Sequence, residues 1–230
     1  MFEISPAEWT AILLSLRVAV IATLVATPFG IALAWLLARY EFWGKSILDA
    51  LVHLPLVLPP VVTGYLLLLT FGRRGLVGAW LADNLGIVFA FRWTGAALAC
   101  GVMSFPLLVR PIRLSIEAID RRLEQASSTL GAAPWQVFAT VTLPLALPGI
   151  LAGMVLGFAK AIGEFGATIT FVSTIPGETE TLPLAMYRAL QSPQGDTQAL
   201  RLTLIAVVIA LAALLGANLL NRWATARGGR

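Results

Sequence analysis

Apolar runs long enough to cross a lipid bilayer recur along this sequence, and few charged residues interrupt them. A helix needs about 20 apolar residues to cross the hydrocarbon, where every backbone N–H and C=O must be paired within the protein. Only 12% of the 230 residues are charged, 58% are hydrophobic, and the mean hydropathy is +0.85. A soluble domain needs more charged surface than this. The sequence therefore predicts an all-α integral membrane protein.

The apolar runs predict five helical spans. They cover residues 13–38, 47–71, 94–109, 145–162 and 202–220. Residues 72–93 lack a charge-free run of the necessary length, so we expect an external segment with a short interfacial piece there. A dip of residues 76–91 into the membrane would make six spans. The second span contains Pro59, Pro60 and Gly64, which should break its helix near mid-membrane.

Five spans place the two termini on opposite sides, and the basic residues predict which side is which. With the N-terminus outside, nine basic residues are cytoplasmic: Arg39, Lys45, Arg110, Arg113, Arg121, Arg122, Arg222, Arg227 and Arg230. Five are external: Arg73, Arg74, Arg92, Arg188 and Arg201. Cytoplasmic loops carry the excess of Lys and Arg, so this orientation is favoured. We expect one membrane domain over residues 10–222, an external tail at 1–9 and a basic cytoplasmic tail at 223–230. The N-terminus has no basic region of the kind that precedes a cleaved signal, so the first span should stay in the membrane.

The sequence argues against catalysis by this chain. His53 is the only histidine and lies far from Cys100, the only cysteine, so we expect no metal site. No HExxH, GxSxG or Walker motif is present, so the chain should bind no cofactor and hydrolyse no ATP itself. The basic residues are scattered at the ends of apolar runs, which argues against a nucleic-acid surface.

Two pairs of ionisable residues lie one helical turn apart near the ends of predicted spans. Asp49 and His53 form the first pair, and Lys160 and Glu164 the second. Charges inside a membrane usually face the bundle interior or a water-filled cavity. Each pair would either satisfy itself or serve a solute, and Lys160 is the best-placed cation if an anion passes. The candidate residues of a translocation path are Pro59, Pro60, Thr63, Gly64, Lys160, Glu164 and Thr168. Simple kinking and packing would also explain the prolines and glycines.

Residues 123–149 are neither apolar enough to span a bilayer nor loose enough for a plain loop. Leu123, Ala126 and Leu130 recur at helical spacing, and Gly131 follows where a helix C-terminus prefers glycine. Pro134 suits the first turn of a second helix, which we expect Leu143-Pro144 to close. The segment predicts two short cytoplasmic helices with a glycine bend, shaped to fit a cleft on another protein.

This segment resembles the EAA loop of ABC-transporter permeases. The landmarks of that loop fall at Gln125, Ala126, Ser127, Gly131, Val141, Leu143 and Pro144, with Pro134 in the second short helix. The family's triplet has Glu where Gln125 stands and Ala where Ser127 stands, although Glu124 is adjacent. The resemblance implies that a separate ATPase subunit docks on these residues.

A second stretch, residues 163–183, reads GEFGATITFVS and then PGET, with hydroxyls at Thr168, Thr170, Ser173 and Thr174. We expect a polar segment just outside the fourth span, and hydroxyls with backbone amides can recognise an oxyanion. The stretch resembles the molybdate-transport permeases and, less closely, the sulfate permeases. The resemblance implies a type I ABC-importer transmembrane domain in a bacterial inner membrane. It implies a homodimer with two ATPase subunits that use ATP and Mg²⁺, and a periplasmic molybdate-binding protein.

Three alternatives stay open. A sulfate or tungstate permease would share the same architecture. A secondary anion transporter would need its own coupling-ion site, for which the chain offers only isolated groups such as Asp49 and Glu164. A membrane scaffold without transport would leave the prolines of the second span and the EAA-like loop without a use.

Overall fold

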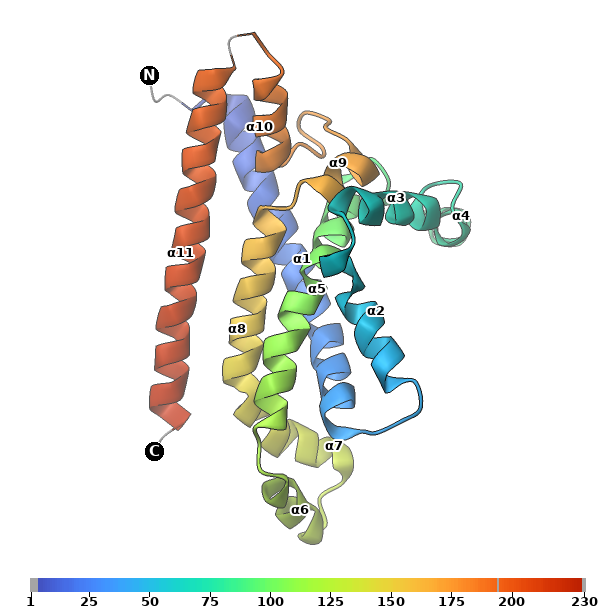
Figure 1. Ribbon diagram of the computed structural model, residues 1–230, viewed down its shortest axis with the longest axis vertical. Helices are drawn as coiled ribbons and strands as arrows, with labels where there is room; N and C mark the ends of the chain where they lie inside the picture. Colours follow the sequence, from blue (N-terminus) through green and yellow to red (C-terminus); the bar gives the residue numbers. More distant parts are fainter. Residues whose placement is uncertain (1–3, 194, 229–230) are drawn as a thin grey trace.

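The computed structural model describes residues 4–193 and 195–228, which form helices and no strand (Figure 1). The elements are α1 Pro6–Arg39, α2 Lys45–Val57, α3 Pro60–Phe71, α4 Leu76–Leu85, α5 Trp93–Glu117, α6 Arg121–Thr129, α7 Pro134–Val137, the π-helical turn η1 Phe138–Thr142, α8 Leu143–Ile162, α9 Gly166–Val172, α10 Leu182–Leu190 and α11 Asp196–Gly228. The all-α prediction is confirmed.

Helices α1, α5 and α8 form the centre of the bundle, and α11 packs along α8 (Figure 1). Small residues let these helices approach closely, because little side-chain volume separates the backbones. A Cβ atom added at Gly153 of α8 would lie 2.5 Å from the Leu108 carbonyl oxygen of α5. A Cβ atom at Gly149 would lie 2.3 Å from Cβ of Ser115. The α5–α8 contact therefore depends on glycine.

Four helical stretches in the described part of the chain are long and apolar enough to cross a membrane unbroken: α1, α5, residues 134–162 and α11. The pair α2 and α3 passes the same test only when it is taken as one broken span, with a bend of 116° at Leu58 and Pro59, and it then makes a fifth crossing. The predicted break is thus confirmed. Helix α1 begins at one end of the molecule and α11 ends at the other, as an odd number of crossings requires (Figure 1).

Two predicted helix ends are wrong. Helix α5 continues to Glu117 rather than stopping at residue 109, and it contains both Pro106 and Pro111. Leu143-Pro144 does not close a helix, because residues 134–162 form one continuous stretch. The π-helical turn explains this continuity. Leu143 N–H donates to the Phe138 carbonyl five residues back, and this wider turn makes room for the ring of Pro144.

The segment after α8 is not the open polar stretch that the sequence predicts. It folds back on the bundle as α9 and α10, and it buries Thr168, Thr179 and Glu180. The backbone N–H of Leu182 donates to Ser15 Oγ of α1 at 2.6 Å, and Arg188 pairs with Glu180 at 2.8 Å. Thr168, Thr179 and Glu180 can be buried because each has a hydrogen-bond or ion-pair partner inside the protein.

Helix α1 is fastened to α11 at the end of the molecule where α1 begins. Ser5 and Glu8 form a capping box at the start of α1. The same Glu8 carboxylate accepts hydrogen bonds from Arg201 of α11 at 2.6 and 2.9 Å, and Glu8 is fully buried. This pair fastens the start of α11 to the start of α1.

We predict that Gly64→Ala destabilises the chain. The added Cβ atom would lie 2.5 Å from the Ala167 carbonyl oxygen and 2.9 Å from its Cα, so backbone must move. A loss of about 1–3 kcal/mol is expected, which lowers the midpoint of thermal unfolding in detergent by about 2–4 °C per kcal/mol. Gly216→Ala is the control, because nothing lies within 4 Å of its added Cβ. Equal melting of the two variants would contradict the close α3–α9 contact.

Candidate functional site

Helices α6 and α7 form a separate tip at the end of the molecule where α11 ends (Figure 1). Asp120 caps α6 by accepting a hydrogen bond from the Arg122 N–H at 2.9 Å. Gly131 follows the helix with a φ of +89°, a conformation that glycine adopts without strain. The Ala132 N–H then donates to the Ser127 carbonyl, and Pro134 starts α7. The predicted first short helix and the bend at Gly131 are confirmed, whereas the second helix is not short, because it continues from Pro134 to Ile162.

Three large apolar side chains of the tip are exposed. Leu130 is 89% exposed, Trp135 is 70% exposed and Leu123 is 51% exposed. Leu123 lies on α6, Leu130 ends that helix, and Trp135 lies on α7. Large exposed apolar side chains on neighbouring elements are typical of surfaces that contact another molecule. We call Leu123, Leu130 and Trp135 the apolar tip.

Glu124 fastens the tip to the membrane bundle. Its carboxylate lies 3.0 Å from Nε of Arg39 at the end of α1, and it accepts a hydrogen bond from Thr142 Oγ1 at 2.6 Å. The Arg39 side chain is only 9% exposed, so this ion pair is shielded from water. Beside it, the ring of Trp35 packs edge-on against Phe138 at 5.3 Å. The tip is therefore held rigidly from α1 and from η1.

The predicted coupling residues divide into two groups. Gln125, Ala126, Gly131 and Pro134 are exposed on the tip, and Ser127 is half-buried with its carbonyl bonded across the bend. Val141, Leu143 and Pro144 lie instead on the helix that leads from the tip into the membrane. The role of Glu124 could not be predicted from the sequence, because its partner Arg39 is 85 residues away in the chain.

The candidate path residues come together where α3 meets α9. Gly64 faces the backbone of Ala167, and a Cβ at Gly166 would lie 2.7 Å from Pro60. Thr63 is only 6% exposed, and its Oγ1 has no hydrogen-bond partner among the described residues. Pro59 ends the break between α2 and α3. The two interrupted segments of the bundle thus pack against each other.

Lys160 and Glu164 form the ion pair that their spacing predicts, at 2.6 Å. Glu164 is almost completely buried, whereas the Lys160 side chain is 30% exposed. The second oxygen of Glu164 accepts a hydrogen bond from the Ala167 N–H at 3.0 Å. Thr168 Oγ1 donates to the Phe165 carbonyl at 2.8 Å. Glu164 therefore joins the end of α8 to the start of α9.

The Asp49–His53 pair is confirmed, with a 3.4 Å contact between its side chains, but it is part of a larger cluster. Arg113 of α5 lies 3.0 Å from Asp49 and 2.7 Å from Glu117. Asp49 therefore serves mainly to attach α2 to α5. Among residues 4–193 and 195–228, no group of three His, Cys, Asp or Glu side chains is placed to hold a metal ion.

Comparison with known proteins gives consistent matches. Residues 26–227 match the family model described as "Binding-protein-dependent transport system inner membrane component". The Molybdenum transport system permease protein ModB of Escherichia coli (strain K12) is 58% identical over 223 residues, which is 97% of each chain. The ModB protein of Haemophilus influenzae is 56% identical and covers 96% of this chain and 94% of its own.

A solved structure shares the fold. It is the crystal structure of a bacterial ABC transporter involved in the import of the acidic polysaccharide alginate. The match has a TM-score of 0.74 at 22% identity and covers 95% of this chain and 80% of that chain. At this identity the likeness concerns the arrangement of helices alone.

We predict that Glu124→Ala loosens the tip. Arg39 would keep a shielded charge without its partner, at a cost of about 1–3 kcal/mol. Local opening should therefore become about tenfold more frequent, and trypsin should cut after Arg121 and Arg122 about tenfold faster. Gln125→Ala is the matched control, since Gln125 is exposed and its side chain makes no hydrogen bond in the described part of the chain. Equal cleavage rates for the two variants would show that Glu124 does not hold the tip.

Proposed function

Because the chain belongs to the family of binding-protein-dependent transport system inner membrane components, we propose that it is the permease subunit of a molybdate importer. It is a multi-pass inner-membrane protein with the transmembrane-domain fold of type I ABC importers. Its relatives at 58% and 56% identity are named as molybdenum transport permeases, which supports molybdate as the transported ion.

The observation that carries the proposed coupling is the apolar tip, which is both exposed and rigidly held. An ATPase subunit docks on α6 and α7 and covers Leu130 and Trp135. A docking element transmits movement only if it does not bend, and the contacts of Glu124 with Arg39 and Thr142 provide that stiffness. ATP binding in the partner would bias the bundle between two arrangements, which is a population shift in the permease.

A single helical stretch connects the tip to the candidate path. Residues 134–162 run without a break from the start of α7 to the end of α8. Glu164 follows directly and binds both Lys160 and the start of α9. Movement of the tip therefore reaches the α3–α9 contact through one helix and one buried carboxylate.

The proposed path passes along Pro59, Pro60, Thr63, Gly64, Lys160, Glu164 and Thr168. Lys160 is already neutralised by Glu164, so a dianion meets no free counter-charge there. Hydroxyls and backbone N–H groups at the α3–α9 break would solvate the oxyanion instead, as such groups can without a full positive charge. Weak solvation suits a path, because an ion that binds tightly is slow to leave.

The partners follow from the same proposal. Two copies of the chain form the path between them, and each copy docks one ATPase subunit that uses ATP and Mg²⁺. A periplasmic protein delivers molybdate at the outer face. We infer an external N-terminus and a cytoplasmic C-terminus, which places α6 and α7 on the ATPase side. The chain itself contributes no ATPase site and no cofactor. Tungstate and sulfate are the alternative ions within this architecture.

The proposal is tested with the chain and its ATPase subunit reconstituted together in liposomes. We expect binding protein loaded with molybdate to stimulate ATP hydrolysis, and binding protein incubated with sulfate to give no stimulation. Equal stimulation by sulfate would reassign the ion while leaving the importer class intact. Failure of the two subunits to co-purify would reject the docking role of the tip.

We predict that Gly131→Val uncouples ATP hydrolysis from transport. Valine strongly disfavours the φ of +89° at this position, so the angle between α6 and α7 must change. Nothing lies within 4 Å of the added Cβ, so insertion and packing of the bundle should be unaffected. Molybdate uptake should fall at least tenfold while the protein level stays normal. Ala132→Val serves as the control, and normal uptake by Gly131→Val would contradict the role of the bend.

A further inference from the structure

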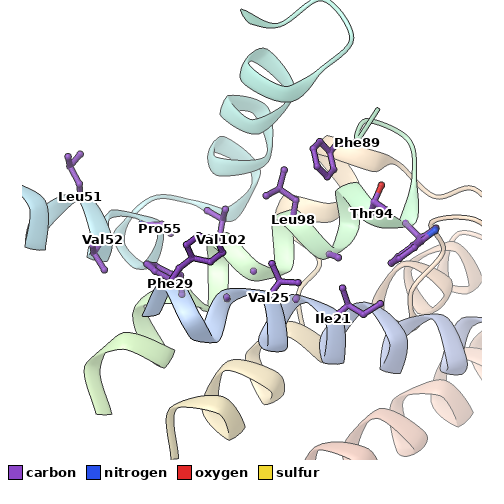
Figure 2. Close-up of a pocket in the computed structure, with 16 residues that line it drawn as sticks. Ile21, Val25, Phe29, Leu51, Val52, Pro55, Phe89, Thr94, Leu98 and Val102 are labelled. Atoms are coloured by element: carbon purple, nitrogen blue, oxygen red, sulfur yellow. The ribbon is translucent and has the colours of Figure 1, made fainter. Parts of the chain in front are cut away.

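An apolar groove runs between α1, α2 and α5, away from the tip and from the α3–α9 contact. Its volume is about 680 Å³. Figure 2 shows Ile21, Val25 and Phe29 of α1 facing Leu98 and Val102 of α5 across it. Thr94 and the indole of Trp93 are the only polar side chains in its lining. Val25 is 59% exposed, so the groove is open to the surroundings of the bundle.

The groove exists because the second predicted span bends away from α1 and α5. Leu51, Val52 and Pro55 of α2 close one end of it (Figure 2). After Val57 the chain bends by 116° into α3, which leaves the bundle sideways. A straight second span would have covered the adjoining stretches of α1 and α5. The bend leaves their apolar side chains without a helical neighbour in the described chain.

The length of the groove matches one leaflet of a bilayer. Ile21 to Phe29 is eight residues, or about 12 Å at 1.5 Å per residue. Trp93 to Phe105 on α5 is twelve residues, or about 18 Å. The hydrocarbon of a bilayer is about 30 Å thick, so one leaflet contributes about 15 Å. An acyl chain fits this length.

The end of the groove nearest the start of α1 carries positive charge. The guanidinium of Arg17 lies 3.8 Å from the centre of the Trp93 ring, one helical turn before Ile21. Arg92 adjoins Trp93 and is exposed. Neither arginine has an acidic side chain within 4.0 Å anywhere in residues 4–193 and 195–228.

Arg17 also lies at headgroup depth. It is 22 residues before Arg39 at the other end of the helix, which is about 33 Å along α1 and close to the thickness of the hydrocarbon. Tryptophan is typical of this level, where its ring meets both the acyl chains and the headgroups.

We propose that this groove binds one anionic phospholipid from the leaflet that contains the first turns of α1. An acyl chain fills the groove between Val25 and Val102, and the headgroup phosphate pairs with Arg17 and Arg92. Two cations without acidic partners select a headgroup of net negative charge over a zwitterionic one. The site is independent of the transported ion and of the ATPase subunit.

The test uses the full chain, purified with its ATPase subunit in detergent and exchanged into micelles that contain phosphatidylglycerol. Native mass spectrometry should show one phosphatidylglycerol retained per chain, and phosphatidylcholine retained at least fivefold less. Arg17→Gln should lower phosphatidylglycerol retention at least fivefold. Arg122→Gln is the control, because Arg122 on the tip is exposed and also has no acidic partner in the described chain.

A second, independent experiment fills the groove with a larger side chain. Val25→Trp should displace the lipid, whereas Val208→Trp should not, because Val208 is 63% exposed on the surface of α11. Equal retention of both lipids, or equal retention by the Arg17 and Arg122 variants, would overturn the proposal. Efficient cross-linking of Val25→Cys between two copies would also overturn it, since a second chain would then cover the groove.

Discussion

The backbone of this protein must satisfy its own hydrogen bonds wherever hydrocarbon surrounds it, and each helix break is arranged accordingly. The break between α2 and α3 lies against α9, with Gly64 and Gly166 allowing backbone contact. The break between α8 and α9 is covered by Glu164, which accepts the Ala167 N–H and holds Lys160. Interrupted helices are tolerated because they meet each other. The same meeting brings together the polar groups of the proposed path.

The rest of the molecule links this region to the water-facing end. Glu124 is the counterpart of Glu164 at the opposite end of residues 134–162, and each carboxylate is bound by a cation and a further donor. The Glu164 side chain is 1% exposed and that of Glu124 is 17% exposed, and ion pairs shielded from water in this way add little net stability while they hold their partners in place. Both ends of residues 134–162 are thus attached to their neighbours by an ion pair and a hydrogen bond, as the proposed coupling requires.

Local patterns in the sequence predict the local features of this structure. The bend at Gly131, the Lys160–Glu164 pair and the proline break all depend on residues within a few positions of each other. Contacts between distant segments could not be predicted in this way. Arg39 and Glu124 are 85 residues apart, and Leu182 reaches Ser15 across 167 residues. The burial of α9 and α10 depends on such contacts, so their polar composition predicted only a polar segment outside the fourth span. The passage of a helix through Pro144 depends on the π-helical turn, which has no simple sequence signal.

The unbroken course of residues 134–162 also has a mechanical consequence. Its α8 portion has 20 residues and is about 30 Å long. Rotation of α8 by only about 5° about the end nearest the tip displaces its other end by about 3 Å, which exceeds the ~1–2 Å helix shifts that are common at subunit interfaces. Small rearrangements of a bound partner are therefore amplified by leverage before they arrive at Glu164. The protein needs little motion at the tip to produce a larger one at the opposite end of α8.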